Sequence, residues 1–165
     1  MMKASEEKTN VMRLLDQKKI PYRHYSYKGT GAISGVEVAA VLGQDEERVF
    51  KTLVTRGKSG SYYVFMIPVA KELNLKAAAK AVGEKSIDMV ASKDLLPLTG
   101  YIHGGCSPIG MKKAFFTVVD ESAKNFDRIV FSGGRIGYQV ETQAKDLEKF
   151  VKLSFAQVAE ENPDR

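Results

Sequence analysis

Lys51 is the first residue whose type and setting could support chemistry, because it stands within the β-rich run 50–54. Alternation along a strand places Lys51 on the same face as Leu53 and opposite to Thr52. A lysine beside a partly desolvated cavity can neutralise negative charge on a carbonyl or phosphate oxygen, and it can act as a base if burial lowers its pKa. The structural alternative is a lysine whose stem covers apolar surface while its ammonium reaches water.

Two glycine-rich segments are the next candidates, residues 104–110 (GGCSPIG) and residues 132–137 (SGGRIG), and each combines three glycines with a serine. Glycine lets a ligand approach the backbone, whose N–H groups can then hold an anion. Neither segment has the spacing of a nucleotide-binding loop, GxxxxGK[ST] or GxGxxG. Two strand turns remain the structural alternative. Together with a strand lysine, the segments indicate a backbone-lined pocket for a carbonyl or phosphate ester.

Few other side chains could act as nucleophiles or metal ligands. The chain has two histidines, His24 and His103, and a single cysteine, Cys106, which cannot supply a zinc site by itself. His103 and Cys106 could form a Cys–His pair, but the two glycines between them disfavour a helical juxtaposition. We therefore expect Cys106 to be a small buried thiol, and we expect neither a metal nor a cofactor.

The elements that must position these residues are short. Strands are predicted at 22–27, 50–56, 61–69, 115–120, 128–131 and 137–141, and helices at 5–19, 36–42, 75–82, 92–96 and 142–151. Ser34 and Glu37 form a capping box, and Asn74 and Ser92 are the other predicted N-caps. We expect a frayed tail from Ala156. Tyr25 and Tyr27 share one strand face, where they either line a site or pack.

Strands and helices are intermingled without regular βαβ units, and tight turns join several strands. These features predict an α+β fold, a single domain over 1–165 with its core at about 20–150. The expected sheet is curled, mixed or mostly antiparallel, barrel-like, and flanked by helices. A content of 44% hydrophobic and 27% charged residues excludes disordered and fibrous classes.

The charge of the chain permits a polyanionic partner without demonstrating one. There are 25 basic and 20 acidic residues, a formal net charge of +5. The longest mostly apolar stretch, 62–70, is much shorter than the ~20 residues of a membrane span, and the polar N-terminus does not fit a signal peptide. We expect a soluble, cytoplasmic protein with no membrane partner.

Three motifs in a fixed order resemble one known family. FKTL at 50–53, TGYIHGGCSPIG at 99–110 and FSGGRIG at 131–137 are similar to motifs of the YbaK/EbsC family of aminoacyl-tRNA deacylases. That family is related to the editing domain inserted in bacterial prolyl-tRNA synthetases. The resemblance runs from Ile20 to about Phe150, and it implies the free-standing, trans-acting form.

The resemblance implies cleavage of the ester between a wrong amino acid and the 3′ end of a tRNA, with Cys-tRNA(Pro) as the expected substrate and prolyl-tRNA synthetase as a further partner. It implies that Lys51 is catalytic and contacts the terminal adenosine phosphate or the ester region. The implied substrate-binding residues are Tyr27, Gly104, Gly105, Ser107, Ser132, Gly133 and Gly134. In the cysteine-specific branch the substrate's own thiol attacks its carbonyl, which agrees with the lack of a convincing nucleophile here.

Two positions depart from the family pattern. Cys106 occupies a position that is more often aliphatic, and Gln139 stands where some members carry an acid. Both departures concern which amino acid is preferred. Two other functions stay open: a non-catalytic module that binds tRNA together with a synthetase, and a hydrolase of small aminoacyl esters that uses the same pocket.

Overall fold

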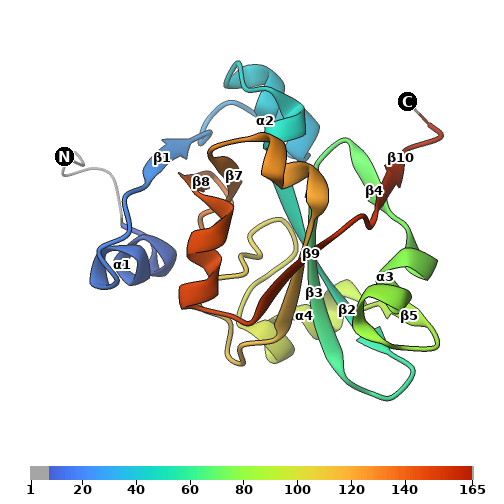
Figure 1. Cartoon of the computed structure of the whole chain (residues 1–165). Helices are drawn as coiled ribbons and strands as arrows, with labels where there is room; N and C mark the ends of the chain where they lie inside the picture. Colours follow the sequence, from blue (N-terminus) through green and yellow to red (C-terminus); the bar gives the residue numbers. More distant parts are fainter. Residues whose placement is uncertain (1–7, 165) are drawn as a thin grey trace.

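The computed structural model describes residues 8–164, in which short helices and strands follow one another (Figure 1). The helices are α1 (Asn10–Gln17), α2 (Gly35–Val41), α3 (Leu75–Val82) and α4 (Ser92–Thr99), with 3-10 turns at Glu46–Arg48, Glu121–Asn125 and Ala144–Lys149. The strands are β1 (Arg23–Ser26), β2 (Phe50–Gly57), β3 (Tyr62–Pro68), β4 (Lys71–Leu73), β5 (Ile87–Met89), β6 (Phe116–Asp120), β7 (Ile129–Ser132), β8 (Tyr138–Thr142), β9 (Leu153–Ala156) and β10 (Ala159–Glu161).

The main sheet has the strand order β5-β2-β3-β6-β9. Its centre is the predicted hairpin β2–β3, in which Lys51 lies opposite Ile67, whereas β6 and β9 add in parallel. A second sheet has the order β1-β8-β7, and β10 pairs with β4. The predicted α+β fold and its mixed, mostly antiparallel pairing are therefore confirmed, and the curled main sheet stays open, with β5 and β9 at its two edges.

Two apolar layers cover the two faces of the main sheet. On one side α1 buries Met12 and Leu15 against Phe50 and Phe131. On the other side α3 packs against β3, and Leu53 of β2 contacts this second layer. Figure 1 shows α1 and α3 at opposite ends of the molecule, with the main sheet between them. The alternation along β2 thus decides which layer each of its side chains meets.

Local signals in the sequence predict most elements correctly. The capping box is present: Ser34 Oγ accepts from Glu37 N at 3.2 Å, and Glu37 Oε1 accepts from Ser34 N at 3.0 Å. Asn74 caps α3, which ends at Gly83. Of the helix predicted at 5–19, α1 forms, and residues 5–7 lie outside the described residues.

Three predictions were wrong. The N-cap of α4 is Ala91, which makes no side-chain cap bond, and Ser92 is the first helical residue. The predicted closing helix is only a 3-10 turn, and β9 and β10 replace the frayed tail. These strands depend on distant partners, because β9 pairs with β6 and Asp120 accepts bonds from the backbone N–H groups of Val158 and Ala159, both at 2.9 Å.

Candidate functional site at the edge of β2

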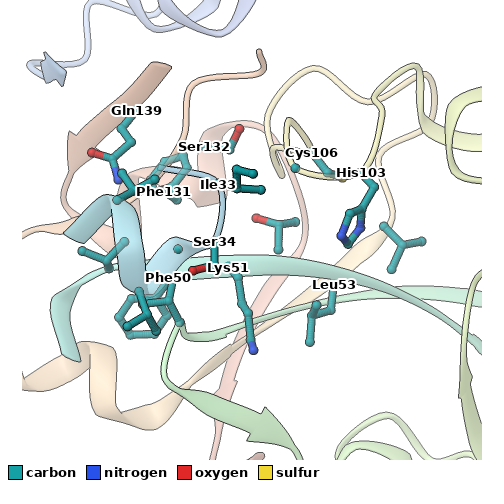
Figure 2. Close-up of a pocket in the computed structure, with 18 of the residues that line it drawn as sticks. Ile33, Ser34, Phe50, Lys51, Leu53, His103, Cys106, Phe131, Ser132 and Gln139 are labelled. Carbon is teal, nitrogen blue, oxygen red and sulfur yellow. The ribbon is translucent and has the colours of Figure 1, made fainter. Parts of the chain in front are cut away.

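A cavity of about 480 Å³ opens beside β2 (Figure 2). Its wall includes all five residues of the FKTL-V run, 50–54, together with residues of the 27–38 loop and helix, the 103–106 segment and strands β7 and β8. Successive side chains of a strand point to opposite faces. A cavity lined by five consecutive residues therefore meets the strand at its edge and reaches around it to both sides.

This edge of β2 carries backbone groups that face away from β3. Val69 N donates to Val49 O at 2.9 Å. Because hydrogen-bonded and non-hydrogen-bonded pairs alternate along an antiparallel ladder, the odd-numbered residues of β2 are the ones hydrogen-bonded to β3. The N–H and C=O of Thr52 and Val54 therefore point to the opposite edge. There Val54 O accepts from Val90 N at 3.0 Å, whereas β5 pairs with β2 only from Thr55 onward, so in residues 8–164 no strand pairs with this edge at Thr52.

Lys51 lies on one side of this edge, as alternation predicts. It is half-buried, and Figure 2 shows its side chain leaving β2 in the same direction as Leu53 and away from Ser132 and Cys106. Burial lowers the pKa of Lys51, and the charge of Glu72 partly opposes that shift. The ammonium is thus partly desolvated at the cavity wall, which is a setting for binding an anion.

The opposite side of the β2 edge is lined by His103, Cys106 and apolar side chains. Figure 2 shows His103 directed from its loop toward β2, on the same side as Cys106. Burial raises the pKa of the Cys106 thiol to about 12, so this thiol stays protonated at neutral pH. This supports the prediction of a small buried thiol and argues against a cysteine nucleophile.

Of the eight predicted site residues, four belong to the cavity wall: the predicted catalytic Lys51 and the predicted substrate-binding residues Tyr27, Gly104 and Ser132. Tyr27 is almost buried, and its backbone N donates to Gly137 O at 2.9 Å. This hydrogen bond ties the loop that begins at Tyr27 to the second glycine-rich segment, residues 132–137. The cavity therefore brings together the strand lysine and both glycine-rich segments.

The other four, Gly105, Ser107, Gly133 and Gly134, lie outside the cavity wall. A Cβ on Gly105 would lie 3.2 Å from Ile136 N, so the two glycine-rich segments are in close backbone contact. A Cβ on Gly134 would lie 2.6 Å from Val11 Cγ2. Ser107 is fully buried, and its Oγ accepts from Ile109 N at 3.4 Å. The geometry indicates that these residues hold the loops together and leaves contact with a ligand to their neighbours.

The electrostatics of the cavity favour negative charge. Among the described wall residues there is no Asp or Glu, and Lys51 supplies a positive charge. Gln139, one of the two positions that depart from the pattern of the resembled family, also belongs to the cavity wall. Its amide oxygen accepts a hydrogen bond from Gln44 Nε2 at 2.8 Å. A neutral, already paired amide thus stands where some members of the resembled family carry an acid.

Sequence reasoning missed Thr52 as a site residue. Its Oγ1 is buried without a hydrogen-bond partner among the described residues.

In residues 8–164, no cluster of His, Cys, Asp and Glu has the three or more members that would suit a metal ion. No helix in the same range has the length and apolar character needed to span a membrane.

Comparison with known proteins gives a consistent result. A family model described as an aminoacyl-tRNA editing domain matches residues 32–150. The EbsC protein of Enterococcus faecalis, to which a Cys-tRNA(Pro)/Cys-tRNA(Cys) deacylase activity is attributed, is 42% identical over 157 residues, which cover 94% of this chain and 96% of EbsC. The proline–tRNA ligase of Thermosipho melanesiensis is 28% identical over 102 residues, 62% of this chain but 18% of the ligase.

Solved structures share the fold. The hypothetical protein APE2540 superposes with a TM-score of 0.82 at 25% identity, and the match covers 93% of this chain and all 100% of the other. A structure described as a candidate trans-editing enzyme for prolyl-tRNA synthetase has a TM-score of 0.77 at 21% identity and covers 91% of this chain and 94% of its own. The arrangement of elements around the cavity is thus a recurring one.

Proposed function

Because the chain belongs to the aminoacyl-tRNA editing domain family, we propose that it is a trans-acting deacylase that cleaves the ester of mischarged tRNA, with Cys-tRNA(Pro) as its substrate. The observation that carries this proposal is the similarity to EbsC along almost the whole of both chains. The cavity at the β2 edge supports it, because a small, acid-free pocket with a lysine suits a short aminoacyl group linked to a phosphate backbone.

We assign two regions of the cavity to two parts of the substrate. Lys51 holds the phosphate of the 3′-terminal nucleotide, because its ammonium is charged, partly desolvated and directed away from the loops. Tyr27, Gly104 and Ser132 enclose the aminoacyl group on the loop side of the strand. The roles first expected for Gly105, Ser107, Gly133 and Gly134 become indirect: they keep the two loops in place.

The chemistry needs little beyond positioning and charge stabilisation, since an aminoacyl ester is already activated. The protonated thiol of Cys106 supplies no nucleophile. We propose that the substrate's cysteine sulfur attacks its own carbonyl: the carbon–sulfur bond forms, the ester carbon–oxygen bond breaks, and the thiol proton passes to the leaving 3′ oxygen. Water takes the place of the thiol if other aminoacyl groups are cleaved.

The test is release of the amino acid from tRNA(Pro) charged with cysteine, alanine or proline, with no synthetase present. We expect many turnovers on Cys-tRNA(Pro), and a fall of about 10²-fold or more in rate for Lys51→Ala. Equal rates for Lys51→Ala and wild type would remove Lys51 from the mechanism. Binding without turnover would favour the tRNA-binding module, and activity on aminoacyl esters lacking RNA would favour the small-ester hydrolase.

Lys51 also predicts a pH dependence. If the charged ammonium holds phosphate, enzymatic activity falls as the pH rises through the lowered pKa of Lys51, below the ~10.4 of an ordinary lysine. Lys51→Arg keeps its charge across that range and should remove the decline. The measurement is the enzymatic rate after subtraction of spontaneous ester hydrolysis. A parallel decline in both proteins would exclude Lys51 as its cause.

We further propose that prolyl-tRNA synthetase can be present in the same complex. The similarity to part of proline–tRNA ligases supports a shared tRNA(Pro) end. Binding to tRNA should weaken with salt, because basic residues exceed acidic ones by five. Co-sedimentation of this chain with the synthetase in the presence and in the absence of tRNA(Pro) tests the proposal.

A further inference from the structure

Thr52 combines two unused hydrogen-bond donors at the middle of the cavity wall. Its Oγ1 is buried with no partner among the described residues, and its backbone N–H points to the edge of β2 where no described strand pairs. Buried polar groups in folded proteins are nearly always hydrogen-bonded. An unpaired hydroxyl beside an unpaired N–H therefore calls for a ligand atom.

The hydroxyl can reach the cavity without losing a bond. Thr52 belongs to the cavity wall, and alternation along β2 puts its side chain on the strand face opposite to Lys51 and Leu53. Because Oγ1 has no partner, rotation about the Cα–Cβ bond breaks no hydrogen bond when it aims the hydroxyl toward a ligand. The hydroxyl and N–H of one residue lie close enough to donate to a single oxygen atom.

We propose that Thr52 is a catalytic residue that donates from its backbone N–H and its Oγ1–H to the carbonyl oxygen of the substrate ester. The inference rests on the deacylase function proposed above. When the nucleophile adds to the carbonyl carbon, the electron pair of the C=O bond moves to this oxygen. It returns as the bond to the 3′ oxygen breaks, and Thr52 stabilises the charge in between.

The surroundings of Thr52 suit a developing negative charge. The described cavity wall contains no carboxylate that would compete for the hydrogens of Thr52 or repel an oxyanion. The side chain of Lys51, the preceding residue, leaves the strand on the other side, where it binds phosphate in the proposed function. Two adjacent residues thus separate the two tasks by the alternation of a strand.

Thr52→Val and Thr52→Ser test this assignment. Valine has the shape and strand preference of threonine but no hydroxyl, whereas serine keeps the hydroxyl. We expect kcat on Cys-tRNA(Pro) to fall by about 10²-fold in Thr52→Val with little change in KM, and serine to restore most of it. Full activity of Thr52→Val, or equal losses in both variants, overturns the proposal. Thermal unfolding confirms the fold, and Thr52→Ala replaces a valine variant that fails to fold.

A second measurement separates charge stabilisation from packing. A phosphonate analogue of the aminoacyl ester on a short acceptor-stem RNA mimics the oxyanion, and a 3′-amide analogue mimics the ground state. Thr52→Val should lose phosphonate affinity by about the same factor as kcat/KM and keep its affinity for the amide. Equal losses for both analogues overturn the proposal. A wild-type protein inactive on every charged tRNA instead refutes the deacylase function itself.

Discussion

The two glycine-rich segments each contain three glycines and a serine, but their surroundings in the fold differ. Residues 104–110 contribute Gly104 and Cys106 to the cavity wall, whereas residues 132–137 contribute only Ser132. Gly104 and Gly134 have nearly the same backbone angle, φ +90° and +91°. Their surroundings differ: the nearest atoms to a Cβ on Gly104 are those of the Ile136 side chain at 3.6 Å, and on Gly134 a buried valine of α1 at 2.6 Å.

This difference shows that a glycine-rich sequence indicates where another group comes close to the backbone, but not whether that group is a ligand or part of the protein core. Gly104 belongs to the cavity wall, and the side chain nearest to a Cβ there, that of Ile136, stays 3.6 Å away, so a ligand can come near this part of the backbone. At Gly134 the neighbour is Val11 of α1, so the glycine makes room for the core. Substitutions at the two positions should therefore separate stability from activity, and the following experiments test that separation.

The largest effect is expected for Gly134→Ala. Its positive φ costs a side chain about 1–2 kcal/mol, and the overlap with Val11 adds about 1–3 kcal/mol. We expect the free energy of unfolding in urea to fall by about 3 kcal/mol. Gly31→Ala is the matched control, since Gly31 has φ +79° with no atom within 4 Å of a Cβ. Equal losses in the two variants would show that the contact with α1 carries no energy.

Gly104→Ala should show the reverse balance. Its positive φ costs about 1–2 kcal/mol, and the space for a methyl group is sufficient. Because Gly104 belongs to the cavity wall, relief of its backbone strain should shift the wall, so kcat/KM should fall by about tenfold at temperatures where the protein stays folded. Folded Gly134→Ala should keep nearly wild-type kcat/KM in the same assay. A tenfold loss in both would end the distinction between the segments.

The smallest effect is expected for Cys106→Ala. The raised pKa, about 12, keeps the thiol protonated, so it takes no part in bond formation. Within the first segment this leaves both Gly104 and Cys106 as cavity wall. We expect kcat to change by less than about threefold. A loss of several orders of magnitude would restore the Cys106–His103 pair as a catalytic unit.

The sequence predicts elements whose signals are local. The capping box of Ser34 and Glu37, the cap at Asn74 and the β2–β3 turn all depend on residues within a few positions of one another. It does not predict β9 or β10, because each strand forms only against a partner far away in the chain. Ser92 has the side chain of an N-cap, but the helix begins one residue earlier than that role requires.

The site was predictable in part for the same reason. Lys51, Tyr27, Gly104 and Ser132 were predicted from motifs, and the structure brings all of them to the cavity wall. Thr52 belongs to the same motif as Lys51, yet nothing in the letters FKTL shows that β5 stops short of it. The unpaired backbone at Thr52 is a property of the sheet, and only the three-dimensional pairing reveals it.

The pairing of β1 with β8, in which Arg23 lies opposite Glu141, has a consequence for biosynthesis. The wall of the cavity brings together Tyr27 and Gln139, which lie 112 positions apart in the sequence. At ~5–20 residues per second, about 5–20 s separate them on the ribosome. A nascent chain therefore has no complete cavity until Gln139 of β8 has been synthesised.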